Sequence, residues 1–137
     1  MSLEGVMRVS GSALAAHTVW LDTVASNLAN SEVVSGSAGD VYRSRQPVFA
    51  TMVEPFGSRR GAVGVKVEGI MEAGPPGRKE YSPHHSLADK DGYIYHSNVN
   101  SVEEMANMIA ASRAYQNSVE AMNTAKQLLV QTLSLGR

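Results

Sequence analysis

The sequence predicts a mainly α-helical protein in which long N- and C-terminal helices pair as a coiled coil around a small β-rich middle. Apolar residues recur at heptad-like spacing near both ends of the 137-residue chain. All five prolines and most of the 12 glycines lie between these ends. Because proline and glycine interrupt helices, the middle is expected to hold turns and short hairpins instead.

The N-terminal helix is expected over about Met1–Asn30. Leu14, Leu21 and Leu28 are spaced by seven residues, and Gly11 allows the close approach of a partner backbone. The Gly/Ser-rich segment that follows Asn30 ends the helix. The complete apolar row is Met7, Gly11, Leu14, Thr18, Leu21, Ala25 and Leu28.

The C-terminal helix is expected over about Ser101–Leu135, without proline or glycine until Gly136. Ser101 and Glu104 are spaced as a capping box at its start. At about 1.5 Å per residue, a helix of this length reaches roughly 50 Å. Its expected apolar row is Met105, Met108, Ser112, Tyr115, Val119, Met122, Lys126, Leu129 and Leu133.

The middle contains short segments with strand and turn patterns. Residues Gly64–Ile70 alternate apolar and polar side chains, and Tyr42–Met52 is a second candidate extended segment. Gly74–Gly77 is a predicted turn, and Asp91-Gly92 leads into a short strand at Tyr93–Tyr95. We therefore expect residues 1–34 and 101–137 to form one coiled-coil domain, with residues 35–100 as the β-rich middle.

Composition argues against several functional classes. The 12 basic and 13 acidic residues leave no positive excess for nucleic acid, and no apolar run is long enough to enter a membrane. The chain has no cysteine. The His84-His85 pair lacks a third metal ligand, and Asp89–Gly92 fits a turn better than a calcium loop. We expect no catalytic, cofactor or metal site, and a protein that is not an enzyme.

Neither terminal helix can cover its apolar row alone, and the two helices differ in length. Apolar surface is therefore expected to remain for neighbouring copies, with the chain ends ordering on assembly. Asn27 and Asn30 are expected either to cap the helix end or to bond a neighbour's backbone, and Arg113 to bridge to a neighbour or to Asp22. The predicted assembly interface comprises Leu14, Leu21, Ala25, Asn27, Leu28, Asn30, Met105, Met108, Arg113, Tyr115, Val119, Met122, Asn123, Leu129 and Leu133.

Two motifs carry a family resemblance. The run Asn27-Leu28-Ala29-Asn30 is similar to the N-terminal signature of flagellar rod and hook proteins. The C-terminal run comprises Asp91–Ile94, Asn98–Met105, Met108–Gln116 and Asn123–Lys126, and it continues to Leu133. This long run resembles the proximal-rod proteins of the bacterial flagellum, and the Tyr42–Arg45 element agrees. The resemblance covers roughly residues 3–34 and 78–137, with departures at His84–Ala88 and Ser97 in the connecting loop.

The resemblance implies a structural subunit of the proximal rod, the drive shaft that transmits torque. It implies export through the flagellar type III apparatus without a cleaved signal peptide, and assembly in the periplasmic part of the basal body. Terminal helices in such proteins line the export channel. The implied partners are other copies, other proximal-rod proteins and the basal-body protein FliE, with the distal rod or membrane ring as further neighbours.

The sequence leaves three alternative functions open. In these, the chain would be a different axial flagellar subunit, a free adaptor that binds partner helices in the cytosol, or a small enzyme. A stably ordered monomer would favour the adaptor, and a deep pocket with convergent polar groups would favour the enzyme.

Overall fold

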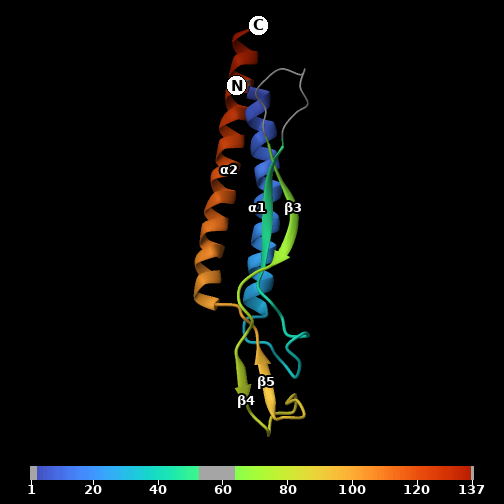
Figure 1. Ribbon diagram of the computed structural model, residues 1–137. Coiled ribbons are helices and arrows are strands. Elements are labelled where there is room, and N and C mark those ends of the chain that lie inside the picture. The colour runs from blue at the N-terminus through green and yellow to red at the C-terminus, as the bar shows by residue number, and fades with distance from the viewer. Residues whose placement is uncertain (1–2, 53–63, 137) are drawn as a thin grey trace. The chain divides into compact units, whose positions relative to one another are not determined.

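The computed structural model describes residues 3–52 and 64–136 and confirms the predicted architecture (Figure 1). Two long helices pack together, and short antiparallel strands lie between them in the sequence. The elements, in order, are α1 Leu3–Ala29, β1 Val34–Ser35, β2 Arg45–Met52, β3 Gly64–Glu72, β4 Lys79–Tyr81, β5 Tyr93–His96 and α2 Ser101–Leu135.

The chain divides into two compact units, and each unit draws on both helices. The first comprises Met1–Leu21, Pro47–Gly69 and Ala110–Arg137, and the second comprises Asp22–Gln46 and Ile70–Ile109. The expected grouping of residues 1–34 with 101–137 as one coiled-coil domain stays a prediction.

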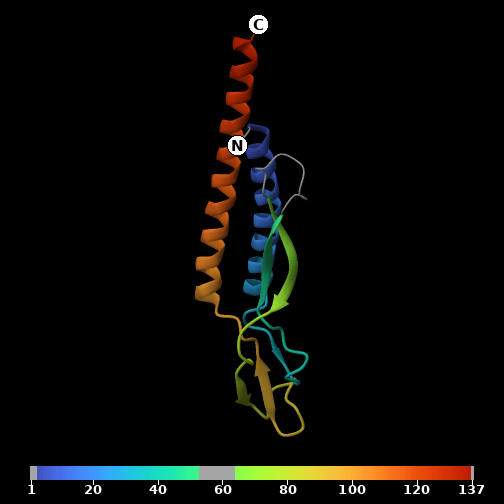
Figure 2. The same cartoon turned by 45° about the horizontal axis from the view of Figure 1, so that its top comes forward.

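In the first unit, α1 and α2 run antiparallel, and β2 and β3 follow α1 (Figures 1 and 2). A Cβ atom placed on Gly11 would lie 3.5 Å from the Met122 methyl carbon, so the small residue keeps the helices close. On α1, the Ser12 hydroxyl donates to the Val9 carbonyl at 2.8 Å and accepts from the Val65 amide at 3.1 Å. Ser12 therefore attaches the start of β3 to the helix.

The covered face of α2 combines two rows with seven-residue spacing. Met108, Tyr115, Met122 and Leu129 form the row that the sequence predicted, from half-buried to marginally exposed. The other row differs from the prediction by one position, and its members are Glu104, Ala111, Ser118 and Ala125. Ala111 and Ala125 are 0% and 3% exposed, because small side chains permit the closest helix approach. The larger Met105 and Leu133 are left exposed.

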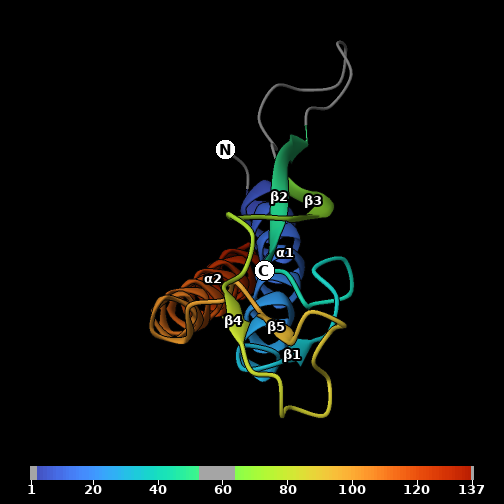
Figure 3. The ribbon, with the colours of Figure 1, turned by 60° about the horizontal axis from the view of Figure 1, so that its bottom comes forward.

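In the second unit, β1, β5 and β4 form an antiparallel sheet in that order (Figure 3). Val34 pairs with His96, and Glu80 pairs with Ile94. Ile94 is the buried centre of the sheet, at 4% exposure. A Cβ atom on Gly77 would collide with the His96 carbonyl oxygen, so only glycine fits where this loop meets β5.

Asn100, rather than the predicted Ser101, caps the start of α2. Its side-chain oxygen accepts from the amides of Val102 at 3.1 Å and Glu103 at 3.4 Å. Asparagine and serine cap helices about equally well, so both residues suited the position, and Asn100 supplies the accepting oxygen. Glu104 is consequently free of a capping role, and its side chain is buried within the second unit.

The predicted turn at Asp91-Gly92 is confirmed. Gly92 has a φ of 80°, and the Gly92 amide donates to the Asp89 carbonyl at 3.0 Å. One Asp89 carboxylate oxygen accepts from the amides of Asp91 at 2.9 Å and Tyr93 at 2.8 Å. The Asp89 carboxylate thus stabilises the turn by accepting hydrogen bonds from backbone amides, as expected for a turn rather than a calcium loop.

Candidate assembly surfaces and the asparagine network

Asn27 is the largest side chain that is fully buried among the described residues, at 1% exposure. Its side-chain nitrogen donates to the Arg45 carbonyl at 2.8 Å, and its side-chain oxygen accepts from the Arg45 amide at 2.9 Å. The same oxygen accepts from the Tyr42 hydroxyl at 2.8 Å. The amide group therefore bonds the first residue of β2 as a neighbouring strand would.

Asn98 fixes the same segment from the other side. Its side-chain oxygen accepts from the Ser44 amide at 2.7 Å. Its nitrogen donates to the carbonyls of Ala73 and Pro75, both at 2.8 Å. The Ser44 carbonyl in turn accepts from the Ala73 amide at 2.8 Å. Two asparagines thus hold consecutive backbone groups of one extended segment, all within the second unit.

Asn30 ends α1. Its backbone amide and its side-chain nitrogen both donate to the Ser26 carbonyl, at 3.2 and 2.8 Å. This confirms the capping interpretation for Asn30. For Asn27, the structure shows a bond to this chain's own Arg45 backbone in place of a cap. Asn27 and Asn98 come from the two motifs that carry the resemblance, and Tyr42 comes from the element that agrees with them. Their hydrogen bonds meet at the adjacent residues Ser44 and Arg45, and we call this set the asparagine network.

The sequence did not single out Tyr42 or Asn98 as functional residues. Both lie within the quoted motifs, so the motifs themselves were the available signal. Their partners are separated by 15 and 54 positions along the chain, and no local pattern connects them.

The predicted interface residues fall into three groups by exposure. Asn27 is buried. The half-buried group is Leu14, Leu21, Leu28, Asn30, Met108, Val119 and Met122. The exposed group is Ala25, Met105, Arg113, Tyr115, Asn123, Leu129 and Leu133. Contact of any of them with a neighbouring subunit stays a prediction.

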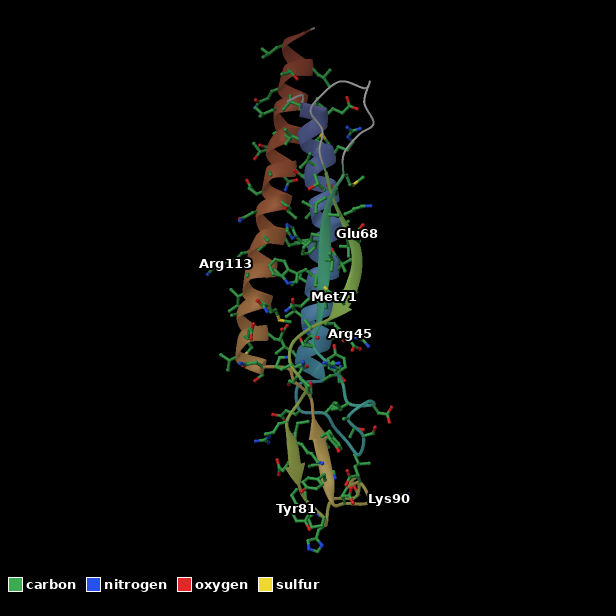
Figure 4. All side chains as sticks on the ribbon, viewed as in Figure 1. Arg45, Glu68, Met71, Tyr81, Lys90 and Arg113 are labelled. Atoms are coloured by element: carbon green, nitrogen blue, oxygen red, sulfur yellow. The ribbon has the colours of Figure 1, made fainter. Side chains whose placement is uncertain are left out.

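Arg113 extends from α2 on the side away from α1 (Figure 4). No ion pair of Arg113 occurs within its own unit among the described residues. The predicted bridge to Asp22, which belongs to the other unit, stays a prediction. A bridge from Arg113 to a neighbouring subunit stays a prediction.

Exposed apolar side chains gather on two parts of α2. In the second unit, Val102, Met105 and Ile109 are 74%, 57% and 57% exposed, and we call these residues the outer stripe. Their spacing of three and four residues places them on one helix face. In the first unit, the last turns of α2 expose apolar side chains on several sides, and we call this set the free end: Leu128, Leu129, Val130, Leu133 and Leu135.

The Asp89 carboxyl is held by the turn that it closes. The backbone amide of Tyr93 is the main cause that lowers the pKa of the Asp89 carboxyl, with the Asp91 amide, the Tyr95 hydroxyl and Lys79 contributing. In the ranges 3–52 and 64–136, no group of three or more His, Asp or Glu side chains is arranged to hold a metal ion. No helix in these ranges is both long and apolar enough to span a membrane.

Two family models match this chain. "Flagella basal body rod protein" matches residues 7–36, and "Flagellar basal body rod FlgEFG protein C-terminal" matches residues 90–135. The first range contains Asn27 and the second contains Asn98. Both models describe flagellar rod proteins, so the protein class that they indicate is a structural protein of the bacterial flagellar rod.

Curated relatives narrow this class. The flagellar basal-body rod protein FlgC of Salmonella typhimurium strain LT2 is 42% identical over 137 residues, with 100% of both chains covered. FlgC of Escherichia coli O6:H1 has the same identity and coverage. FlgC of Buchnera aphidicola from Schizaphis graminum is 37% identical, with 99% of both chains covered. The chain belongs to the FlgC family of flagellar basal-body rod proteins.

Membership of this family establishes that the chain is a structural rod subunit of the flagellar basal body and that it assembles with other rod proteins. It is not an enzyme.

Proposed function

We propose that this chain is a proximal-rod subunit that joins its neighbours through the exposed apolar surfaces of its terminal helices. Torque passes through the packed helices, and the helices line the channel through which distal subunits are exported. The outer stripe and the free end support this proposal, because their large apolar side chains are exposed to solvent in the single chain.

The size of the outer stripe supports an assembly role. Full burial of one such side chain contributes about 1.5–3 kcal/mol, so covering the exposed parts of these three contributes about 3–6 kcal/mol. A contact of that size is weak for an isolated pair of molecules. It becomes effective in a rod, where each copy repeats the contact with successive neighbours.

The asparagine network gives the rod subunit its rigidity. A shaft that transmits torque requires the strand segments to keep their positions on the helix ends. Asn27 and Asn98 hold the backbone of Ser44 and Arg45 with hydrogen bonds of 2.7–2.9 Å. These asparagines therefore act within each subunit, whereas the outer stripe and the free end act between subunits.

The partners in this proposal are other copies, other proximal-rod proteins and FliE, and the location is the periplasmic section of the basal body. Export through the flagellar type III apparatus brings the chain there.

The test replaces Ile109 with aspartate in cells that lack their own copy of this protein. Ile109→Asp places a charge on the outer stripe and leaves the covered face of α2 intact. We expect loss of motility and of rod assembly, at unchanged cellular levels of the protein. The matched control is Asn117→Asp, which is also exposed on α2 but lies outside both surfaces. Normal rods in the Ile109→Asp strain would refute the proposal.

A further inference from the structure

The second unit contains a cleft of about 410 Å³. Its floor and walls are mostly apolar, with Val41, Pro76 and Tyr95 among the lining residues. Val41 is only 8% exposed, so the floor belongs to the packed interior of the unit. A volume of this size accommodates one or two aliphatic side chains together with a stretch of backbone.

Two cationic side chains, Arg43 and Lys79, also line this cleft. The Lys79 ammonium lies 3.9 Å from the Tyr93 ring centroid and 5.6 Å from that of Tyr95. The aromatic rings therefore hold its charge in place. The Arg43 guanidinium forms a long ion pair with the Glu72 carboxylate of its own chain at 4.0 Å, beyond hydrogen-bond distance, and the Arg43 side chain is 40% exposed. It retains donors for a further carboxylate.

One face of β3 has the complementary pattern. Glu68, Ile70 and Glu72 alternate along the strand, so their side chains share one face. Ile70 is 54% exposed, the Glu72 side chain is 56% exposed, and Glu68 on the same strand is exposed as well (Figure 4). This face therefore presents a carboxylate, an aliphatic side chain and a second carboxylate in turn. None of the three residues is among those that line the cleft of their own chain, although Glu72 pairs with Arg43, which does line it.

We propose that the cleft of one copy receives the Glu68–Glu72 face of β3 from a second copy. Ile70 of the second copy occupies the apolar floor, and its two flanking carboxylates face Arg43 and Lys79. Charge complementarity selects this occupant, because an apolar cleft with a cationic rim matches an aliphatic residue between two acids.

The contact joins two different surfaces of the same chain. Such a head-to-tail contact leaves a free cleft at one end of a pair and a free strand at the other, so further copies can add. It goes beyond the helix packing proposed above and uses none of the residues of the outer stripe or the free end. Each contact is therefore open to its own test.

The test measures binding of a fluorescently labelled peptide of residues 64–73 to the full chain by anisotropy. We expect saturable binding that weakens about fivefold or more with Arg43→Glu, which corresponds to roughly 1 kcal/mol. The peptide carrying Glu68→Lys should bind the unmodified chain weakly and regain affinity for the Arg43→Glu chain. Ala38→Trp fills the cleft from its wall and should abolish binding without a change of charge.

Two controls make the result specific. Arg78→Glu reverses a neighbouring exposed charge that does not line the cleft, and should change affinity less than twofold. A scrambled peptide that separates the isoleucine from the two glutamates should not bind. Equal binding of the scrambled peptide overturns the proposal, and so does unchanged binding by the Arg43→Glu and Ala38→Trp chains. Neither result bears on the helix packing.

Discussion

Replacing Asn27 with alanine should loosen the connection between the end of α1 and the start of β2. The side chain is 1% exposed and satisfies the amide and carbonyl of Arg45 as well as the Tyr42 hydroxyl. Alanine removes all of these bonds and offers no replacement. The Arg45 amide and carbonyl then depend on water, whereas the Tyr42 hydroxyl keeps its hydrogen bond with the Ser26 hydroxyl at 3.2 Å.

The size of the effect follows from the bonds that are lost. Each net hydrogen bond contributes about 1 kcal/mol, and an unsatisfied buried group costs about 1–3 kcal/mol. Alanine recovers about 0.5 kcal/mol through its higher helix propensity. We therefore expect the free energy of unfolding of Asn27→Ala to fall by about 2–3 kcal/mol. Tyr42→Phe, which removes one of the three bonds, should cost about 1 kcal/mol.

Urea denaturation followed by circular dichroism gives the free energy of unfolding, and exchange of the Arg45 amide proton reports the local effect. In the double variant, Tyr42→Phe should add less to Asn27→Ala than it costs alone, because its bond to Asn27 is already lost and only its 3.2 Å bond to Ser26 remains. The control is Asn117→Ala, an exposed asparagine on a helix. If Asn27→Ala falls within about 0.5 kcal/mol of that control, the structural role assigned to the network is refuted.

Three further predictions concern the packing and the turn. Gly77→Ala should speed amide exchange in β5, because the new Cβ meets the His96 carbonyl; Gly69→Ala, with no atom within 4 Å, should not. Ala111→Leu overpacks a fully covered site and should cost about 1–3 kcal/mol of unfolding free energy, whereas Ala121→Leu at an exposed site should cost little. The pKa of Asp89 is lowered below 3.8 by the Tyr93 amide, so its contribution to stability is complete above that pH and disappears as the pH falls through the lowered pKa. Asp89→Asn should remove this step from an acid-unfolding curve, and an unchanged curve would contradict the assignment.

Local patterns predicted the elements well where the chain is regular. The expected helix Ser101–Leu135 has the observed bounds, and the alternation at Gly64–Ile70 marks β3. The signal is strong in these segments because every residue repeats the same period. The two-residue strand β1 lies in a segment without any such repeat, and only its pairing with β5 defines it.

The site was predictable only in part, since its key bonds join distant positions. The motifs identified Asn27 as important, yet its partner Arg45 lies 18 residues away and offers only its backbone. Of the two rows on the covered face of α2, one was predicted correctly and the other lies one residue before its predicted position. The sequence pattern predicted that the larger Met105 would be covered. In the structure, the smaller Ala111 and Ala125 are buried instead, because they let the helices pack closely.

The central claim is that apolar surface exposed in the single chain is covered in the assembled rod. Because the chain has no cysteine, Ile109→Cys introduces a single thiol into the outer stripe. The decisive measurement is its rate of reaction with a bulky maleimide in isolated basal bodies, compared with the purified chain and with basal bodies dissociated by acid. The account predicts labelling at least about tenfold slower in the intact basal body, with recovery on dissociation. Equal rates in all three samples would contradict it.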